Sequence, residues 1–374
     1  MEKLIRWGIW GTGAIAHSAA DDLRLVSGTL LHGVASRRVE RARSFAAEQG
    51  IARFYTGLQA LLDDPEIDVV YIASPNHCHL DDSLSCIQAG KALLCEKPFA
   101  LDLHQAQRIV DAARQRKVFC MEAMWTRFIP AIIEAKRCID AGMIGSIRLI
   151  QGNFSYPVPA GGEARFFDRE LGGGAMLDRG VYLISLAQHL LGIPRSIGGT
   201  AYLGPTGVDE QSGYQLAYTG GALADLAASL RVRGTNEVWI FGDGGLLRLC
   251  EPFYRAHRLV LKLYAPQQAV VGEDARPNSR GVGKIVAGVR KSPIAKSLLR
   301  RFSPLRALLS RGKVRSFPFA GNGYQFQFAE VSQCVREQRN ESAIMPLDDS
   351  LEVMRTMDAL RAQWNPARPQ VTAP

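Results

Sequence analysis

The chain of 374 residues is 47% hydrophobic, enough to bury one large core or two moderate ones, and carries a formal net charge of +9. No stretch approaches the roughly twenty apolar residues of a transmembrane helix, and the N-terminal segment lacks a signal-peptide pattern, so we expect a cytoplasmic protein. Seven scattered cysteines without a Cys-x-x-Cys pair argue against a disulfide framework or a zinc site, and no metal is predicted.

The N-terminal residues predict a nucleotide-binding turn. A β-rich segment from Leu4 to Trp10 leads directly into Gly11-Thr12-Gly13-Ala14-Ile15-Ala16, and a helical stretch follows to about Ser27. In this Gly-x-Gly-x-x-Ala pattern the first glycine allows a tight turn, the second lets a pyrophosphate approach the backbone, and the alanine packs the helix on the strand. The strand before the motif and the helix after it strengthen the prediction.

The end of the second predicted strand bears on the choice of cofactor. NAD-binding chains usually carry an acid there for the ribose 2′-hydroxyl, but the strand from Leu31 to Ala35 ends in Ser36-Arg37-Arg38. A hydroxyl and a guanidinium suit a 2′-phosphate, so the sequence favours NADP over NAD. The alternative is that both arginines simply begin a solvated helix.

Strands and helices alternate up to about residue 125. An apolar strand from Asp68 to Ala73 ends at Ser74-Pro75-Asn76-His77-Cys78-His79, and a helix to Ala89 follows. A second apolar strand, 92–95, ends at Glu96-Lys97-Pro98, and the pattern continues with a helix and a strand to Met121. This order predicts a doubly wound parallel sheet, so that both polar segments lie at its carboxyl edge, where ligands bind.

Lys97 is the first candidate for the chemistry. A lysine beside a cofactor that becomes cationic on oxidation would hold its proton less tightly, through like charge and desolvation. It could then exchange a proton with a substrate hydroxyl near neutral pH. The alternative is a structural, ion-paired lysine at a strand end.

The pattern changes after residue 125, where we place the boundary between an N-terminal domain, 1–125, and a second domain, 126–374. A helix near 129–141 precedes short strands joined by turns, and two helices near 325–338 and 347–363 close the chain. This pattern predicts an α+β domain with a large, open, mainly antiparallel sheet. The predicted strands are Ile147 to Phe154, Tyr214 to Tyr218, Leu223 to Leu230, Glu237 to Phe241, Leu246 to Leu249, Leu259 to Tyr264 and Val314 to Phe319.

A basic insertion interrupts this domain at about 270–315. From Arg276 to Arg315 there are twelve basic residues and no acidic one, whereas the rest of the chain has 33 basic and 36 acidic residues. Ser292-Pro293 and Ser303-Pro304 are typical helix starts, and apolar residues from Ile294 to Leu309 recur at helical spacing, which predicts a basic amphipathic hairpin. It could be a surface excursion without a function, an anionic membrane contact, or a lid over an anionic substrate.

Five segments together resemble the glucose-fructose oxidoreductase/inositol dehydrogenase/rhizopine-catabolism (Gfo/Idh/MocA) family. They are the glycine motif, Ser74 to His79, Glu96 to Pro98, Met121 to Phe128, and Gly172-Gly173-Gly174-Ala175-Met176-Leu177-Asp178-Arg179-Gly180-Val181-Tyr182. The last two resemble the dimeric dihydrodiol dehydrogenase and NADP-dependent D-xylose dehydrogenase branch, since many relatives have a histidine in place of Tyr182. The resemblance implies a Rossmann domain, an open sheet that often forms an oligomer interface, and hydride exchange with an alcohol carbon.

The resemblance also implies roles for individual residues. Tyr182 would be the general acid/base, although its reference pKa of about 10 suits that task only if the Lys97 ammonium stabilises the phenolate. Asp178, one helical turn earlier, would bind a substrate hydroxyl or orient the pair; it could instead cap a helix, and Tyr182 could be a core residue. His77 and His79 lie where the family's turn lines the cofactor, but a structural role is equally expected.

The aromatic segment at the domain hinge is expected to wall the substrate site, with simple packing as the alternative. The predicted substrate contacts are Trp125, Arg127, Phe128, Phe154, Asp178 and Tyr182. The predicted cofactor contacts are Gly11, Thr12, Gly13, Ala14, Ile15, Ser36, Arg37, Arg38, Ser74, Pro75, Asn76, His79, Glu96 and Lys97.

These observations predict an NADP-dependent oxidoreductase that interconverts a secondary alcohol or hemiacetal carbon of a sugar, cyclitol or cyclic trans-diol and its carbonyl. A homodimer or homotetramer formed through the open sheet is expected, and no nucleic-acid partner. A non-catalytic NADP-binding regulator and a peripheral membrane enzyme acting on a lipid-linked or anionic substrate are the alternatives.

Overall fold

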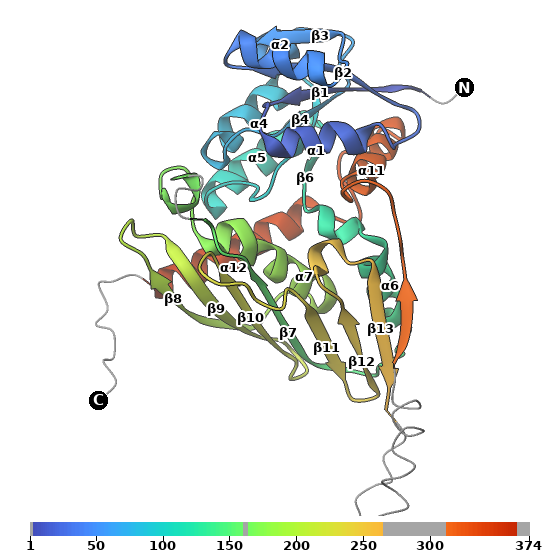
Figure 1. Cartoon of the computed structure of the whole chain (residues 1–374), viewed down its shortest axis with the longest axis vertical. Helices are drawn as coiled ribbons and strands as arrows, with labels where there is room; N and C mark the ends of the chain where they lie inside the picture. The colour runs from blue at the N-terminus through green and yellow to red at the C-terminus, as the bar shows by residue number, and fades with distance from the viewer. Residues whose placement is uncertain (1–2, 160–163, 265–311, 365–374) are drawn as a thin grey trace, which may run out of the picture.

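The computed structural model describes residues 3–159, 164–264 and 312–364, and these form two sheets with helices around and between them (Figure 1). The basic segment predicted at 276–315 lies almost entirely outside these residues; only its last positions appear, in a short strand, β14 (Lys313–Ser316). None of the helices within the described ranges is both long and apolar enough to cross a membrane.

The N-terminal sheet has six strands in the order β3-β2-β1-β4-β5-β6, and each neighbouring pair is parallel. Its central strand β4 is buried along its whole length because helices cover both faces, as the apolar run predicted. The order is that of a Rossmann fold. The strands and helices of this part are β1 (Ile5–Trp10), α1 (Ala14–Leu23), β2 (Thr29–Ser36), α2 (Val39–Glu48), β3 (Arg53–Thr56), α3 (Leu58–Leu62), β4 (Val69–Ile72), α4 (His79–Gln88), β5 (Ala92–Cys95), α5 (Leu103–Arg116) and β6 (Cys120–Glu122).

The second sheet has eight strands in the order β14-β13-β12-β11-β7-β10-β9-β8. β10 pairs in parallel with β7, and the other neighbouring pairs are antiparallel. The predicted fold class, a Rossmann domain with an α+β domain built on an open and mainly antiparallel sheet, is confirmed. The further strands are β7 (Ile147–Ser155), β8 (Ser196–Leu203), β9 (Asp209–Ala217), β10 (Leu223–Ser229), β11 (Val238–Gly242), β12 (Gly245–Leu249) and β13 (Arg258–Leu263).

Helices lie on the side of the second sheet that faces the Rossmann part (Figure 1). α7 (Val181–Leu191) packs on β7 and β10, α12 (Leu347–Gln363) on β8, and α6 (Pro130–Asp140) on β12 and β13. α11 (Gln325–Arg336) instead packs against α1 and β1, so the chain returns to the N-terminal part before it ends. The strands alternate buried and less buried residues, as in β11, so one face of this sheet stays uncovered in the single chain.

Two short segments connect the sheets and position the candidate site. A 3₁₀ turn, η2 (Trp125–Phe128), follows β6, and a π-helix over Met176–Gly180 leads directly into α7. The sequence predicted a regular helical turn between Asp178 and Tyr182, so the π-helix is a correction. Single-turn π segments are rare in proteins, and those that occur often lie at functional sites.

Candidate active site

The turn after β1 has the geometry of a nucleotide-binding turn. Gly11 has a φ of +120°, and a Cβ at this position would lie 2.5 Å from the carbonyl oxygen of Ala73, so only glycine fits. Gly13 is the N-cap of α1, and a Cβ added to it meets nothing within 4 Å, which leaves its backbone open to a ligand. An open backbone at a helix N-terminus can bind a pyrophosphate. Thr12, Ala14 and Ile15 lie in the same turn.

Ser36, Arg37 and Arg38 lie at the carboxyl end of β2, the next strand of the sheet. Ser36 is the last residue of the strand and is mostly buried, and its hydroxyl accepts a hydrogen bond from the Arg38 amide at 3.4 Å. Both arginine side chains are exposed. Their guanidinium groups are therefore accessible to an anionic group bound beside the turn. Ser36 places a short, uncharged side chain at the end of the strand.

The segment after β4 is held to the rest of the site by hydrogen bonds. The Ser74 hydroxyl donates to Asp82 at 2.6 Å, and the Asn76 amide donates to the Gly172 carbonyl at 3.1 Å, while Pro75 is exposed. His79 is fully buried, and its two ring nitrogens lie 3.0 Å from the Ser74 carbonyl and 2.8 Å from the Pro98 carbonyl. A buried ring with a carbonyl oxygen beside each nitrogen fits the structural role, and the cofactor contact of His79 stays a prediction.

Glu96 and Lys97 follow β5 but differ in their surroundings. Glu96 is buried and accepts hydrogen bonds from the Tyr71 hydroxyl and the Lys97 amide; burial raises the pKa of its carboxyl group, and these bonds oppose the rise. The Lys97 ammonium instead crosses to the second domain, where it donates to the carbonyl oxygen of Asp178 at 2.9 Å and to its carboxylate at 3.2 Å. Lys97 and Asp178 are therefore brought together, as the motifs predicted.

Asp178 lies in the middle of the π-helix, so it does not cap a helix. Its carboxylate pairs with Lys97 at 3.2 Å and with Arg179 at 3.3 Å. Burial alone would raise the pKa of Asp178, but the charges of Lys97, Arg179 and Arg165 hold it below the ordinary value. Asp178 is an anion at neutral pH, ready to accept hydrogen bonds from a hydroxyl group.

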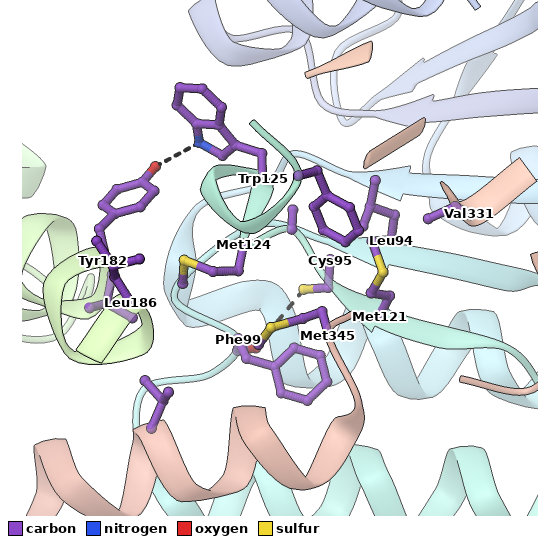
Figure 2. Close-up of a cluster of buried hydrophobic side chains, with 14 of the residues drawn as sticks. Leu94, Cys95, Phe99, Met121, Met124, Trp125, Tyr182, Leu186, Val331 and Met345 are labelled. Atoms are coloured by element: carbon purple, nitrogen blue, oxygen red, sulfur yellow. Dashed lines mark hydrogen bonds between the residues drawn. The ribbon is translucent and has the colours of Figure 1, made fainter. Parts of the chain in front are cut away.

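Tyr182 lies in the first turn of α7, with the Lys97 ammonium 4.9 Å from the centre of its ring. Its hydroxyl accepts a hydrogen bond from the Trp125 indole at 3.0 Å, and Figure 2 shows the two side chains pointing toward each other from α7 and η2. Burial raises the pKa of Tyr182 well above 10, and the negative charge of Glu96 adds to the rise. In the free protein Tyr182 is therefore a neutral phenol, and stabilisation of its phenolate by Lys97 stays a prediction.

Aromatic residues from distant parts of the chain surround Tyr182. Phe154, at the end of β7, is stacked on Tyr254 with ring centres 4.4 Å apart and lies 5.4 Å from Tyr182. Tyr324 packs on Trp125 at 4.6 Å. Tyr254 and Tyr324 were not predicted, because each lies in a connection far along the chain with no motif around it.

Arg179 is a third residue that the sequence did not single out. Its guanidinium is mostly buried and donates to the carbonyl oxygens of Tyr156 and Ser229, at the ends of β7 and β10, and to Asp178. It thus ties the π-helix to the second sheet. The one feature of the sequence that could have identified Arg179 is its position next to Asp178. An arginine in that position can equally face solvent.

Arg127 and Phe128, predicted as walls of the substrate site, lie elsewhere. The guanidinium of Arg127 is 1% exposed; it donates to Ser185 in α7, to the carbonyl of Ile344, and to Asp349 in α12. Phe128 is buried in the core. Arg127 has all these partners inside the protein and joins three elements, so the packing alternative applies to it and to Phe128.

The described residues contain one group that could bind a metal, formed by His32, Asp64 and Glu66. Arg53 already pairs with both carboxylates, at 2.8 Å from Asp64 and 2.5 Å from Glu66. This cationic side chain already occupies both carboxylates of the cluster, which contains none of the predicted site residues.

Comparison with known proteins agrees with this geometry. Residues 5–124 match the model of an oxidoreductase family with an NAD-binding Rossmann fold, and residues 132–248 match the GFO/IDH/MocA C-terminal domain. The chain is similar to trans-1,2-dihydrobenzene-1,2-diol dehydrogenase of Xenopus tropicalis, with 30% identity over 94% of this chain and 96% of that protein. The human protein of this name is 32% identical over 69% of this chain and 78% of its own length.

Solved structures share the fold over the full length. KijD10, a 3-ketoreductase from Actinomadura kijaniata in complex with NADP and TDP-benzene, superposes with a TM-score of 0.75 at 24% identity, covering 96% of this chain and 97% of its own. Aldose-aldose oxidoreductase from Caulobacter crescentus gives a TM-score of 0.78 at 20% identity, covering 98% and 99%. With the two family models and the Xenopus relative, these observations show that the chain belongs to the Gfo/Idh/MocA oxidoreductase family.

Proposed function

We propose that the protein is an NADP-dependent dehydrogenase or reductase that acts on a secondary alcohol or hemiacetal carbon of a sugar, cyclitol or cyclic trans-diol. The observation that carries the proposal is the cluster of Lys97, Asp178 and Tyr182. It joins the carboxyl edge of the Rossmann sheet to the start of α7, with Lys97 within hydrogen-bonding distance of Asp178 and 4.9 Å from the Tyr182 ring. An ammonium, a carboxylate and a phenol are the groups that proton exchange with a polyol requires.

The residues around the glycine turn support the choice of cofactor. Gly11 and Gly13 leave the backbone at the start of α1 open to a pyrophosphate, and the exposed Arg37 beside Ser36 suits a ribose 2′-phosphate. When bound, NADP supplies or accepts the hydride. The chain's own task is therefore to hold the substrate oxygen and to move its proton.

We assign to Tyr182 the exchange of a proton with the substrate oxygen. As a neutral phenol in the free protein, it can donate its proton to a carbonyl oxygen during reduction. In the oxidation direction Tyr182 must first release its own proton to solvent, and the resulting phenolate, stabilised by the adjacent Lys97 ammonium, then takes the proton of the substrate hydroxyl. The Trp125 indole orients the hydroxyl through its hydrogen bond. Asp178 would accept a hydrogen bond from a neighbouring substrate hydroxyl.

The substrate class follows from these surroundings and from the relatives. The stacked Phe154 and Tyr254 present aromatic rings beside Tyr182, and Asp178 presents a carboxylate, a combination that suits a ring bearing adjacent hydroxyl groups. The relatives' names include a trans-diol dehydrogenase, an aldose-aldose oxidoreductase and a levoglucosan dehydrogenase. These names are consistent with cyclic polyols as substrates of this chain.

The proposal is tested by measuring NADP⁺ reduction and NADPH oxidation with aldoses, cyclitols, cyclic trans-diols and keto-sugars. Lys97→Met and Tyr182→Phe should each lower kcat by roughly 10²- to 10⁴-fold and leave NADP(H) affinity within a few-fold. The double variant should be little worse than either single one, since the two residues act as a unit. Tyr202→Phe, at an exposed tyrosine of β8, is the matched control and should keep full activity.

The same assay separates the alternatives. A non-catalytic regulator would bind NADPH tightly and turn over none of the substrates. In that case Tyr182→Phe would leave NADP(H) affinity unchanged and would have no activity to lower. A membrane enzyme acting on a lipid-linked substrate would be inactive on soluble polyols and active on anionic vesicles that contain the lipid. That second alternative depends on the basic segment at 276–315, which lies almost wholly outside the described residues.

We also propose that the open face of the second sheet forms a homo-oligomer. Trp239 and Phe241 of β11 lie on this face, stacked with ring centres 6.0 Å apart, and Leu149 and Leu246 pair with Phe241 on the neighbouring strands. The Arg248 guanidinium covers the Trp239 ring at 4.9 Å. An apolar strip across several adjacent strands is typical of a buried interface.

A further inference from the structure

One strand of the second sheet, β9, contacts both ends of the π-helix that contains Asp178. At the start of the π-helix the Asp209 carboxylate accepts a hydrogen bond from the Met176 amide at 2.8 Å. At its end, Gly180 lies against the hydroxyl of Tyr214; a Cβ on Gly180 would be 2.4 Å from that oxygen. Asp209 and Tyr214 are both buried.

The two contacts are connected to each other. The Ser212 hydroxyl donates to Asp209 at 2.7 Å and lies 2.6 Å from the Tyr214 hydroxyl. These three residues of β9, which we call the β9 clamp, therefore form one hydrogen-bonded row beneath the π-helix. Buried polar groups that are linked in this way have well-defined positions, because each would lose its partner if it moved.

The glycine turn before the π-helix is shaped to the same carboxylate. Gly174 has a φ of +115°, and a Cβ there would lie 2.3 Å from the Asp209 carboxylate. The turn is also fixed by backbone hydrogen bonds. The Gly173 amide donates to the Asp168 carbonyl at 2.8 Å, and the Gly174 amide donates to the Phe166 carbonyl at 2.9 Å. Asp209 therefore meets the chain at the point where it enters the π-helix, two residues before Asp178.

We propose that the β9 clamp positions Asp178 and Tyr182 against Lys97, with Asp209 as the principal positioning residue. The proposal rests on the function proposed above, in which these three residues act on the substrate. Met176 and Gly180 bracket Asp178 in the sequence, and Tyr182 follows two residues later, so a displacement of either end moves both side chains. Displacements of about 1 Å at a reacting centre can lower a rate on the order of 100-fold.

The first test needs no substrate. Hydrogen exchange measured by mass spectrometry should show faster exchange of peptides covering 174–182 in Asp209→Ala than in the parent protein. Asp209→Asn, whose amide oxygen can still accept from Met176, should fall between them. Asp111→Ala, at an exposed aspartate of α5, is the control and should not change this region. Unchanged exchange of 174–182 in Asp209→Ala overturns the proposal, whether or not a substrate is known.

The second test separates positioning from general stability. Asp209→Ala should lower kcat by about 10- to 100-fold in the parent background, and by no more than about twofold when Asp178 is already alanine and Tyr182 already phenylalanine, because the clamp acts through these two side chains. Tyr214→Phe, which removes the hydroxyl at the other end, should give a smaller loss of the same kind. An equal loss of kcat in both backgrounds would overturn the proposal. A parent protein inactive on every polyol would instead count against the proposed function, and the exchange test would still decide the clamp.

Discussion

Replacing Arg127 with methionine should destabilise the protein and leave its activity nearly intact. The guanidinium is 1% exposed and donates to the Ser185 hydroxyl at 3.0 Å, to the Ser185 carbonyl at 3.2 Å and to the Ile344 carbonyl at 3.3 Å, besides its ion pair with Asp349. Breaking a buried pair typically costs about 3 to 5 kcal/mol. Asp349 is 40% exposed and can regain water, so we expect a loss of about 3 kcal/mol, the lower end of that range.

The assay is urea unfolding of the parent and the variant, followed by steady-state kinetics of the folded protein. Arg355→Met is the matched control: this arginine of α12 is 56% exposed and pairs with Glu352, so its loss should cost under about 1 kcal/mol. The KM of Arg127→Met should stay within about twofold of the parent value, since the side chain points at α7 and α12. A KM raised tenfold with unchanged unfolding free energy would show that Arg127 contacts the substrate and would refute the reasoning.

Three further predictions concern cofactor choice, pH and assembly. Arg37→Ala should weaken NADP(H) binding by about 1.5 to 3 kcal/mol and hardly change NAD(H) binding, as titration calorimetry can measure; equal affinities for both cofactors in the parent would contradict it. Burial raises the pKa of Glu122 from 4.5 to about 7, so its contribution to stability is present below pH 4.5 and is lost as the pH rises through 7. Urea unfolding between pH 5 and 8 should therefore show a decline, on the order of 3 kcal/mol at most, that Glu122→Gln removes. Trp239→Glu should convert the oligomer into monomers in sedimentation analysis, and a parent that is already monomeric would exclude that interface.

The sequence predicted most of the fold because the N-terminal part follows regular rules. Apolar runs that end in Gly11, Ser74 and Glu96 predict buried parallel strands, and the corresponding strands β1, β4 and β5 are largely buried and parallel. Two strands were missed, β3 and β8, and each is an edge strand of its sheet. β3 has four residues, three of them exposed, and β8 contains Gly198 and Gly199, which are more typical of turns.

The candidate site was predictable where its residues lie in contiguous motifs. Lys97, Asp178 and Tyr182 meet because the Glu-Lys-Pro segment ends a strand and the glycine run starts a helix, and both signals are local. Tyr254 and Tyr324 reach the same site from other parts of the chain, and nothing within a few residues of either distinguishes it from a packing tyrosine. Arg127 shows the converse error, in which a residue inside a motif turned out to serve the packing of three helical segments.

The contact between Lys97 and Asp178 also has a structural consequence for catalysis. Lys97 follows a strand of the sheet that would hold the cofactor, whereas Asp178 and Tyr182 belong to the segment that the second sheet supports. The ion pair therefore connects the two halves of the site directly, and it is largely shielded, with exposed side-chain fractions of 14% and 19%. A shielded pair of this kind fixes relative position as well as charge, since its strength falls steeply when the groups separate. The proposed proton-transfer residues and the sheet that would hold the cofactor are thus joined by the same lysine that is proposed to stabilise the phenolate, and the effect of losing Lys97 would combine both contributions.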